Sequence, residues 1–309
     1  MTEKIRQLEN KSKPYLLDHK FYHRVAIDVD SCLTGIEGID LLAKIRGVGK
    51  TVTEMTRNAM GEGGSFNVAL ARRLELIQPK EKDLDYVANI YIKNIVKDAR
   101  VVIELLQANG VDTMLLSGGF RNSIIPLAKF IGIPEQNIYA NDLFFNEEGE
   151  YLGFDGGNLL SQEKGKKKQI EKLKHKKTGF YAIIGDGVSE LETEPETDFR
   201  IGFGGFVQRE RVMKEADIFL SEPTFTPLIL LLLDPQKIRK IFYEQLENRE
   251  ILIKAFNSMS GVLFRERAKP LQQSIIELYE EFVFYTKFIS PDRIHPCSMD
   301  DNGLFSLVQ

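Results

Sequence analysis

The stretch Arg24-Val-Ala-Ile-Asp-Val-Asp30 decides the fold of this chain. Its apolar start runs directly into acidic residues, which is typical of a buried parallel strand whose carboxyl end carries chemistry. On a regular strand Asp28 and Asp30 would point the same way, because alternate side chains share one face. The sequence therefore predicts a pair of reactive carboxyl groups at the end of a central strand.

Apolar segments further along the chain also have the character of strands: residues 111–117, 137–140, 181–185 and 198–202. Helical periodicity separates them, for example over 122–130 and 164–174. Strands that alternate with helices predict a parallel α/β sheet. Residues 142–146 and 150–154, on either side of a Glu-Gly pair, predict a small hairpin.

Helical patterns dominate two longer parts of the chain. From about Ile36 to Asn109 no strand signal interrupts them, and after Pro235 the alternation of strands and helices stops. The predicted fold is therefore a Rossmann-like parallel α/β sheet core, with a helical cap inserted after the first strand and a helical C-terminal extension. We expect the following division: N-terminal arm, 1–22; α/β core, 23–36 and 102–235; helical cap, 37–101; C-terminal extension, 236–309.

The composition is that of an ordinary globular protein in a reducing compartment. Of the 309 residues, 43% are hydrophobic and 28% are charged, and the net charge of -4 argues against a general nucleic-acid binder. The two cysteines, Cys32 and Cys297, are too few for a disulfide framework or a zinc ribbon. No apolar run reaches membrane-spanning length, and the first residues lack the apolar core of a signal peptide. We therefore expect a cytoplasmic protein that binds neither nucleic acid nor membrane.

More polar groups follow the predicted strands. Residues 117–119 are Ser-Gly-Gly after the second strand, and Asp186 follows the strand 181–185. Lys164 opens the helix just before that strand. Because ligands of open α/β sheets bind beyond the carboxyl ends of the strands, we expect these groups to converge with Asp28 at one edge of the sheet.

This set of groups suits a magnesium-assisted reaction at a phosphate. A phosphate dianion repels a carboxylate nucleophile, and a hard cation held by carboxylate and carbonyl oxygens offsets that repulsion. One carboxyl group of the pair can then attack phosphorus while the other protonates the leaving oxygen. Each motif alone could be a plain turn, a helix cap or a solvated charge, and their shared position at strand ends favours the joint interpretation.

The motifs resemble those of the haloacid dehalogenase superfamily and, within it, the phosphoserine phosphatases. The segments that carry the resemblance are Asp28-Val-Asp30-Ser, Leu116-Ser-Gly-Gly-Phe120, Lys164-Gly165 and Ile184-Gly-Asp-Gly187. The cap segments beginning at Glu37, Glu54 and Leu74 are also similar to that family. The resemblance covers roughly residues 23–233.

The resemblance implies a role for each core residue. Asp28 would be the nucleophile and Asp30 the general acid/base. Magnesium would be held by Asp28, by the backbone carbonyl of Asp30 and by Asp186, with support from Glu190. The phosphoryl group would be held by Ser117, Gly118, Gly119 and Lys164.

The resemblance also implies a substrate, because phosphoserine carries an ammonium and a carboxylate beside its phosphate. In the cap, Glu37 would bind the ammonium and Arg73 the carboxylate, a pairing that makes electrostatic sense. Met60 and Phe66 would form the walls of the pocket. The implied reaction is the hydrolysis of O-phosphoserine to serine and phosphate through an aspartyl-phosphate intermediate.

Two residues depart from the family pattern. Cys32 stands where the family usually has Thr, and Glu190 stands where it usually has Asp. A small buried thiol is the better interpretation of Cys32, because no arginine follows it at the spacing of a cysteine phosphatase loop. Two alternatives stay open: a phosphatase of the same superfamily for another phosphoester or a phosphoprotein, and a catalytically weakened regulator that binds phosphorylated ligands. A homodimer or partner contact through the C-terminal helices is a further expectation.

Overall fold

The computed structural model describes residues 24–62 and 66–288 of the chain. Within these ranges, the side chains of residues 56–62, 66 and 286–288 lie outside the description. In the described part, no helix combines the length and the apolar character that crossing a bilayer requires.

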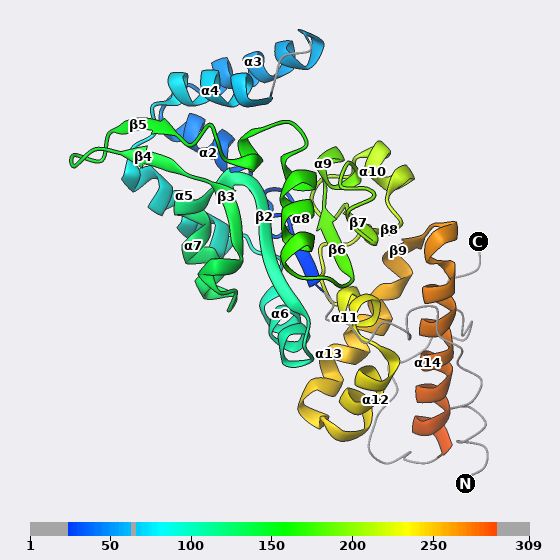
Figure 1. Ribbon diagram of the computed structural model, residues 1–309. Helices are drawn as coiled ribbons and strands as arrows, with labels where there is room; N and C mark the ends of the chain where they lie inside the picture. Colours follow the sequence, from blue (N-terminus) through cyan, green and yellow to red (C-terminus); the bar gives the residue numbers. More distant parts are fainter. Residues whose placement is uncertain (1–23, 63–65, 289–309) are drawn as a thin grey trace.

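A seven-stranded sheet forms the centre of the molecule, in the order β3-β2-β1-β6-β7-β8-β9 (Figure 1). The strands are β1 (Arg24–Ile27), β2 (Asp112–Phe120), β3 (Ile138–Asn141), β6 (Tyr181–Gly185), β7 (Phe199–Phe203), β8 (Ile218–Leu220) and β9 (Val262–Phe264). All neighbours pair in parallel except β8 and β9, which are antiparallel. The predicted fold class, a mostly parallel α/β sheet of Rossmann-like type, is confirmed.

The order of the strands places the ends of β1, β2 and β6 next to one another. The chain leaves β1 toward β2 and β3 on one side, and later continues from β6 on the other side. Ile27 lies in register with Leu115 of β2 and with Ile184 of β6. Ligands of open α/β sheets bind where the strand order reverses in this way. The residues just beyond these three strands therefore share one edge of the sheet.

Helices cover both faces of the core: α6 (Ala99–Ala108), α7 (Arg121–Phe130), α8 (Gly165–Lys176), α9 (Val188–Leu191), α10 (Glu210–Glu215) and α11 (Pro227–Leu232). All four residues of β1 are buried, as the apolar pattern predicts for a central strand. Val25 and Ile27 belong to the large core that includes residues of α6 and α11, whereas Ala26 packs in a second cluster with Ile170 of α8. The side chains of β1 therefore alternate between the two faces of the sheet.

The cap consists of four helices between β1 and α6: α2 (Gly38–Ile45), α3 (Gly49–Glu62), α4 (Phe66–Ile77) and α5 (Glu81–Lys93). A two-stranded hairpin, β4 (Leu143–Phe145) and β5 (Tyr151–Phe154), lies beside them, as the sequence predicts (Figure 1). Short 3-10 turns occur at Glu135–Asn137, Leu159–Ser161, Ser258–Gly261 and Glu266–Ala268, and we label the second of them η2.

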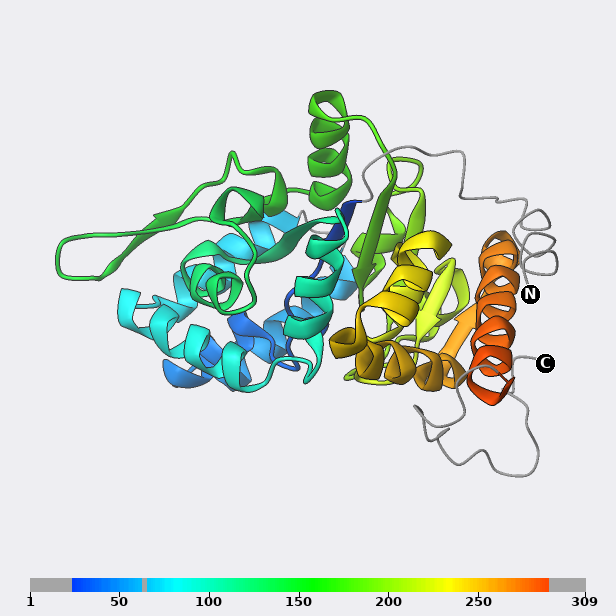
Figure 2. The same ribbon diagram turned by 90° about the horizontal axis from the view of Figure 1, so that it is seen from below.

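The C-terminal part continues from the core into α12 (Pro235–Glu244), α13 (Leu246–Asn257) and α14 (Lys269–Phe288). The cap and these helices lie at opposite ends of the molecule (Figures 1 and 2). Aromatic rings fill the space between the three helices: Phe242, Tyr243, Phe256, Tyr279, Phe282 and Tyr285. The extension is helical as predicted, and it also supplies β9 to the sheet, which the sequence does not predict because three residues are too few to show a period.

Candidate active site

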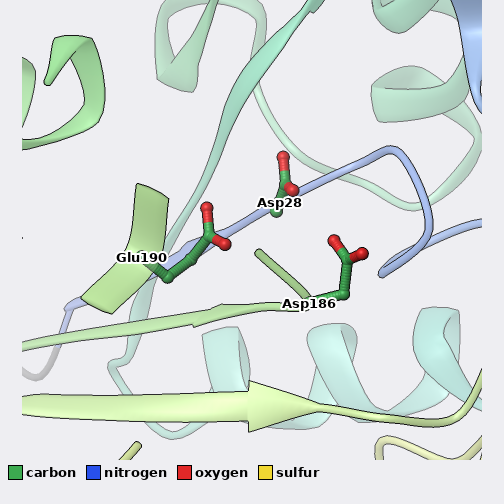
Figure 3. Close-up of side chains that lie close together, drawn as sticks. All are labelled: Asp28, Asp186 and Glu190. Carbon is green, nitrogen blue, oxygen red and sulfur yellow. The ribbon is translucent and has the colours of Figure 1, made fainter. Parts of the chain in front are cut away.

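Three buried carboxyl groups meet beyond the carboxyl ends of β1 and β6 (Figure 3). Asp28 follows β1, Asp186 follows β6, and Glu190 lies on the short helix α9 that comes next. Their side chains point toward one another, and one oxygen of each lies within 4.8 Å of the others. Their residues are 7%, 4% and 1% exposed, respectively.

The chemistry of these donors fits a hard divalent cation. All three offer carboxylate oxygens, which are the ligands that magnesium and calcium prefer. Burial raises the pKa of Asp28 well above its ordinary value and also raises the pKa of Asp186, because water no longer solvates the charged forms. A bound cation would relieve this cost by balancing the negative charges.

Lys166 provides a positive charge within the same cluster. Its Nζ lies 2.7 Å from Oδ1 of Asp28 and 2.5 Å from Oε1 of Glu190. Burial disfavours the charge on Lys166, but the two carboxylates outweigh burial and raise its pKa, so the side chain stays an ammonium ion. Lys166 therefore holds the carboxylate of Asp28, the predicted nucleophile, close to the carboxylate of Glu190, the predicted metal support.

The sequence predicts Lys164 at this site, as a ligand of the phosphoryl group, and does not single out Lys166. Lys164 is exposed, has a left-handed backbone conformation (φ 54°) at the start of α8, and lines the cavity. Lys166, Gln169 and Ile170 are all buried, and their spacing places them on one face of α8. That spacing is a signal in the sequence that could have separated Lys166 from the solvated lysines around it.

Glu190 is longer than the expected aspartate, and two glycines make room for it. A Cβ on Gly185 would lie 2.5 Å from Cδ of Glu190, closer than real contacts allow. The N–H of Gly187 donates to Oε2 of Glu190 at 2.8 Å, and the hydroxyl of Ser189 donates to Oε1 at 2.8 Å. The extra methylene is therefore accommodated by a folded-back side chain, and the carboxylate still reaches the cluster.

Asp30, the second acid of the first motif, is held by donors from three directions. Its Oδ1 accepts hydrogen bonds from the hydroxyl of Tyr91 and from the N–H of Gly38, each at 2.6 Å. Its Oδ2 accepts a hydrogen bond from the hydroxyl of Ser117 at 3.2 Å. Burial raises the pKa of Asp30, and these donors oppose the shift. A carboxyl group whose pKa is shifted upward suits a role in proton transfer near neutral pH.

The Ser-Gly-Gly segment, residues 117–119, lies within the last part of β2 rather than after it, because the strand continues to Phe120, and it packs against Asp30. A Cβ on Gly119 would lie 2.7 Å from Oδ2 of Asp30, so a larger residue would displace the acid. The N–H of Gly119 donates to the hydroxyl oxygen of Ser117 at 2.9 Å. The side chain of Asn141 at the end of β3 donates to the carbonyl of Gly118 at 2.8 Å, and this contact holds the Ser-Gly-Gly segment in place.

A cavity of about 460 Å³ joins the core groups to the cap. Its lining includes the following predicted site residues: Asp28, Asp30, Glu37, Arg73, Gly118, Gly119, Lys164 and Asp186. Ser117 and Glu190 are connected to this set through Asp30 and Lys166. The side chains of Met60 and Phe66 lie outside the described part of the chain, so their predicted place in the pocket stays a prediction.

Two charged residues of the cap face this cavity. Glu37 lies directly before α2, and its Oε1 accepts a hydrogen bond from the hydroxyl of Ser31 at 2.6 Å. Burial, with a contribution from Asp30, raises the pKa of Glu37 to about 7. Burial lowers the pKa of Arg73 on α4, while Asp40 and Glu37 oppose that shift. An acid and a base of the cap therefore sit at the same cavity as the carboxyl cluster.

Arg209 is a neighbour of the cluster that the sequence interpretation missed. Its Nε donates to Oδ2 of Asp186 at 3.0 Å, and its Nη2 lies 2.8 Å from the same oxygen in an ion pair. Cys32, in contrast, behaves as expected: it is a fully buried free thiol, and burial raises its pKa well above the ordinary value. A thiol with a raised pKa is a poor nucleophile.

Comparison of sequences supports the same class of protein. The chain is 40% identical to phosphoserine phosphatase of Homo sapiens over 202 residues, which are 64% of this chain and 88% of that protein. It is 39% identical to the chloroplastic phosphoserine phosphatase of Arabidopsis thaliana over 198 residues, which are 62% of this chain and 66% of that protein. No protein-family model matches the chain.

Solved structures share the fold. A substrate-bound phosphoserine phosphatase has a TM-score of 0.59 at 20% identity and covers 69% of this chain and 100% of its own. A haloacid dehalogenase family hydrolase of Salmonella enterica serovar Typhi has a TM-score of 0.61 at 18% identity and covers 70% of this chain and 73% of its own. The fold and the cluster of acids are those of a phosphatase of the haloacid dehalogenase type. At the level of sequence, the chain belongs to the phosphoserine phosphatase family.

Proposed function

We propose that this enzyme hydrolyses O-phospho-L-serine to serine and phosphate with the help of magnesium. The observation that carries the substrate assignment is the presence of Glu37 and Arg73 at the same cavity as Asp28 and Asp30. A carboxylate and a guanidinium match the ammonium and the carboxylate of a phosphorylated amino acid. The names of the curated relatives support the same substrate.

In the first proposed step, a carboxylate oxygen of Asp28 attacks phosphorus. Because Lys166 holds Oδ1, we assign the attack to Oδ2. The bond between Asp28 and phosphorus forms as the bond between phosphorus and the serine oxygen breaks. The protonated carboxyl group of Asp30 gives its proton to the leaving oxygen, and serine departs as a neutral alcohol.

In the second proposed step, water releases the phosphate. The carboxylate of Asp30 takes a proton from water, whose oxygen then bonds to phosphorus. The bond between phosphorus and Asp28 breaks, which yields inorganic phosphate and restores both side chains. Asp30 therefore alternates between acid and base within one turnover.

The remaining groups of the site would compensate the negative charge of the phosphate. Magnesium, held by Asp28, Asp186 and the carbonyl of Asp30 with support from Glu190, would screen the repulsion between carboxylate and phosphate. Ser117, Gly118, Gly119 and Lys164 are proposed to hold the phosphoryl oxygens.

A phosphate-release assay with a graded substrate panel tests this proposal. O-phospho-L-serine should turn over fastest with magnesium and should fail when a chelator removes the metal. O-phosphoethanolamine lacks the carboxylate that Arg73 would bind, so its KM should be much higher. Asp28→Asn should abolish turnover, whereas Asp85→Asn, a change of an exposed acid on α5, should not.

Different outcomes would remove different parts of the proposal. Full turnover by the Asp28→Asn variant would eliminate the covalent mechanism. Rapid turnover of a phosphotyrosyl peptide, with phosphoserine untouched, would replace only the substrate.

The proposed reaction yields serine, so the enzyme would catalyse a serine-forming step. We also propose a cytoplasmic location, because the free thiol of Cys32 suits a reducing compartment. A homodimer or partner contact through α12–α14 stays a prediction.

A further inference from the structure

Tyr91 brings a hydroxyl group from the cap to the proposed acid/base. It lies in the last turn of α5 and is fully buried. Its hydroxyl donates to Oδ1 of Asp30 at 2.6 Å, across a sequence separation of 61 residues. Burial and the nearby carboxylate of Asp30 raise the pKa of Tyr91 well above its ordinary value, so the hydroxyl keeps its proton and remains a donor.

Gly38 leaves space for the hydrogen bond between Tyr91 and Asp30. The N–H of Gly38 donates to the same Oδ1 of Asp30, also at 2.6 Å. A Cβ on Gly38 would lie 2.0 Å from the hydroxyl oxygen of Tyr91, so only glycine fits at this position without a shift. Two elements of the cap, the start of α2 and the end of α5, therefore converge on one oxygen atom.

Two donors on Oδ1 determine what the other oxygen of Asp30 can do. An oxygen that accepts two short hydrogen bonds has no room for a proton of its own. The proton that Asp30 carries must then sit on Oδ2. Oδ2 faces the Ser-Gly-Gly segment of β2, 3.2 Å from the hydroxyl of Ser117. That segment is where the phosphoryl group is proposed to bind.

We propose that Tyr91 is a positioning residue for the reaction: with the N–H of Gly38, its hydroxyl fixes the carboxyl group of Asp30 so that Oδ2 exchanges the proton with the leaving oxygen and with water. This inference rests on the proposed role of Asp30. It does not depend on the identity of the substrate, because every phosphomonoester needs the same proton transfer unless its leaving group is a good one.

The test compares Tyr91→Phe with Tyr181→Phe as a matched control. Tyr181 is also a buried tyrosine, but its hydroxyl donates to the carbonyl of Lys177 at 3.0 Å, away from the cavity. Each variant keeps its ring and loses one buried hydroxyl. The measurements are kcat/KM for O-phospho-L-serine and for p-nitrophenyl phosphate, and the melting temperature of each variant.

Tyr91→Phe should lower kcat/KM for phosphoserine by about tenfold, because a misplaced carboxyl group delivers its proton less well. It should lower kcat/KM for p-nitrophenyl phosphate by less than about threefold, because p-nitrophenolate leaves without a proton. The ratio of the two values is the decisive readout, since a general structural disturbance would lower both equally. Tyr181→Phe should leave the ratio unchanged.

Two outcomes would overturn the inference. One is a ratio for Tyr91→Phe equal to that of Tyr181→Phe; the other is an equal loss on both substrates together with a lower melting temperature. If the wild-type enzyme does not hydrolyse phosphoserine but hydrolyses another alkyl phosphate, the proposed function fails while the comparison proceeds with that ester. The two failures are thus distinguishable. If Tyr91→Phe does not fold, Gly38→Ala displaces the same hydroxyl and is judged by the same ratio.

Discussion

Replacing Lys166 with methionine would remove the ammonium group between Asp28 and Glu190 while keeping most of the length of the side chain. In the metal-free protein the variant would retain a cluster of buried acids without the nearby lysine. We expect a large loss of stability for this reason, and we expect magnesium to restore part of it.

The magnitude follows from the geometry of the two contacts. At 2.7 Å and 2.5 Å, and with an effective dielectric constant of about 20, each attraction amounts to about 6–7 kcal/mol before solvation is considered. The loss of hydration on burial offsets much of this gain. Removing one partner of a buried ion pair typically costs about 3–5 kcal/mol, and we expect Lys166→Met to fall in that range.

The loss should depend on pH in a defined direction. Burial raises the pKa of Asp28 above its ordinary value of 3.8 although Lys166 opposes the shift, so we expect the pKa to stay raised when Lys166 is replaced. A carboxyl group of this kind stabilises the folded state at low pH, where it is protonated, and this contribution disappears as the pH rises through the folded-state pKa. The deficit should therefore be smaller at pH 5 than at pH 8.

Urea unfolding with and without magnesium measures both effects. Lys168→Met is the matched control, because Lys168 is an exposed lysine on the same helix. The control should lose less than about 0.5 kcal/mol. Equal stability of the two variants in metal-free buffer would refute the electrostatic reasoning. A loss that magnesium does not reduce would refute the proposed placement of the metal among these acids.

Three further changes test other parts of the site. Burial raises the pKa of Glu37 to about 7, and only its ionised form attracts an ammonium, so KM for phosphoserine should rise as the pH falls below 7. Glu37→Gln should flatten this dependence of KM on pH. A variant with the same dependence as the wild type would contradict the proposed role of Glu37. Gly185→Ala should cost about 1–3 kcal/mol in urea unfolding, because its methyl group meets Glu190, and adding Glu190→Asp should recover part of that cost. Cys32→Ala should keep kcat within about threefold, since its thiol has a raised pKa, whereas loss of turnover in a folded variant would point to a catalytic thiol.

The centre of the fold and the core of the candidate site were accessible from the sequence for one physical reason. A buried parallel strand must be apolar along its length and can become polar only at its end. Asp28 and Asp186 mark such ends, and the parallel register brings those ends together. The helical cap was visible for a similar reason, since apolar residues recur there at helical spacing; Leu70, Leu74 and Ile77 of α4, for example, are all buried. The proposed division into domains stays a prediction.

The missed features depend on three-dimensional packing. Lys166 differs from its neighbouring lysines in the face of α8 that it occupies, and a run of lysines conceals that difference. Tyr91 reaches Asp30 from a helix far along the chain, so no local pattern reveals the contact. β8 and β9 contain three residues each, too few for a period to be recognised. Short elements and long-range contacts therefore limit what a single sequence can show.

The antiparallel strand β9 has a consequence for how this protein can be shortened. It hydrogen-bonds along the outer side of β8, the last parallel strand. The sequence resemblance to the phosphoserine phosphatases covers roughly residues 23–233, and a fragment trimmed to that region would lack β9. An open row of unpaired peptide groups invites pairing with another molecule. In the full chain β9 pairs with these groups of β8, and a fragment cut before Val262 would leave them open to solvent and to other molecules.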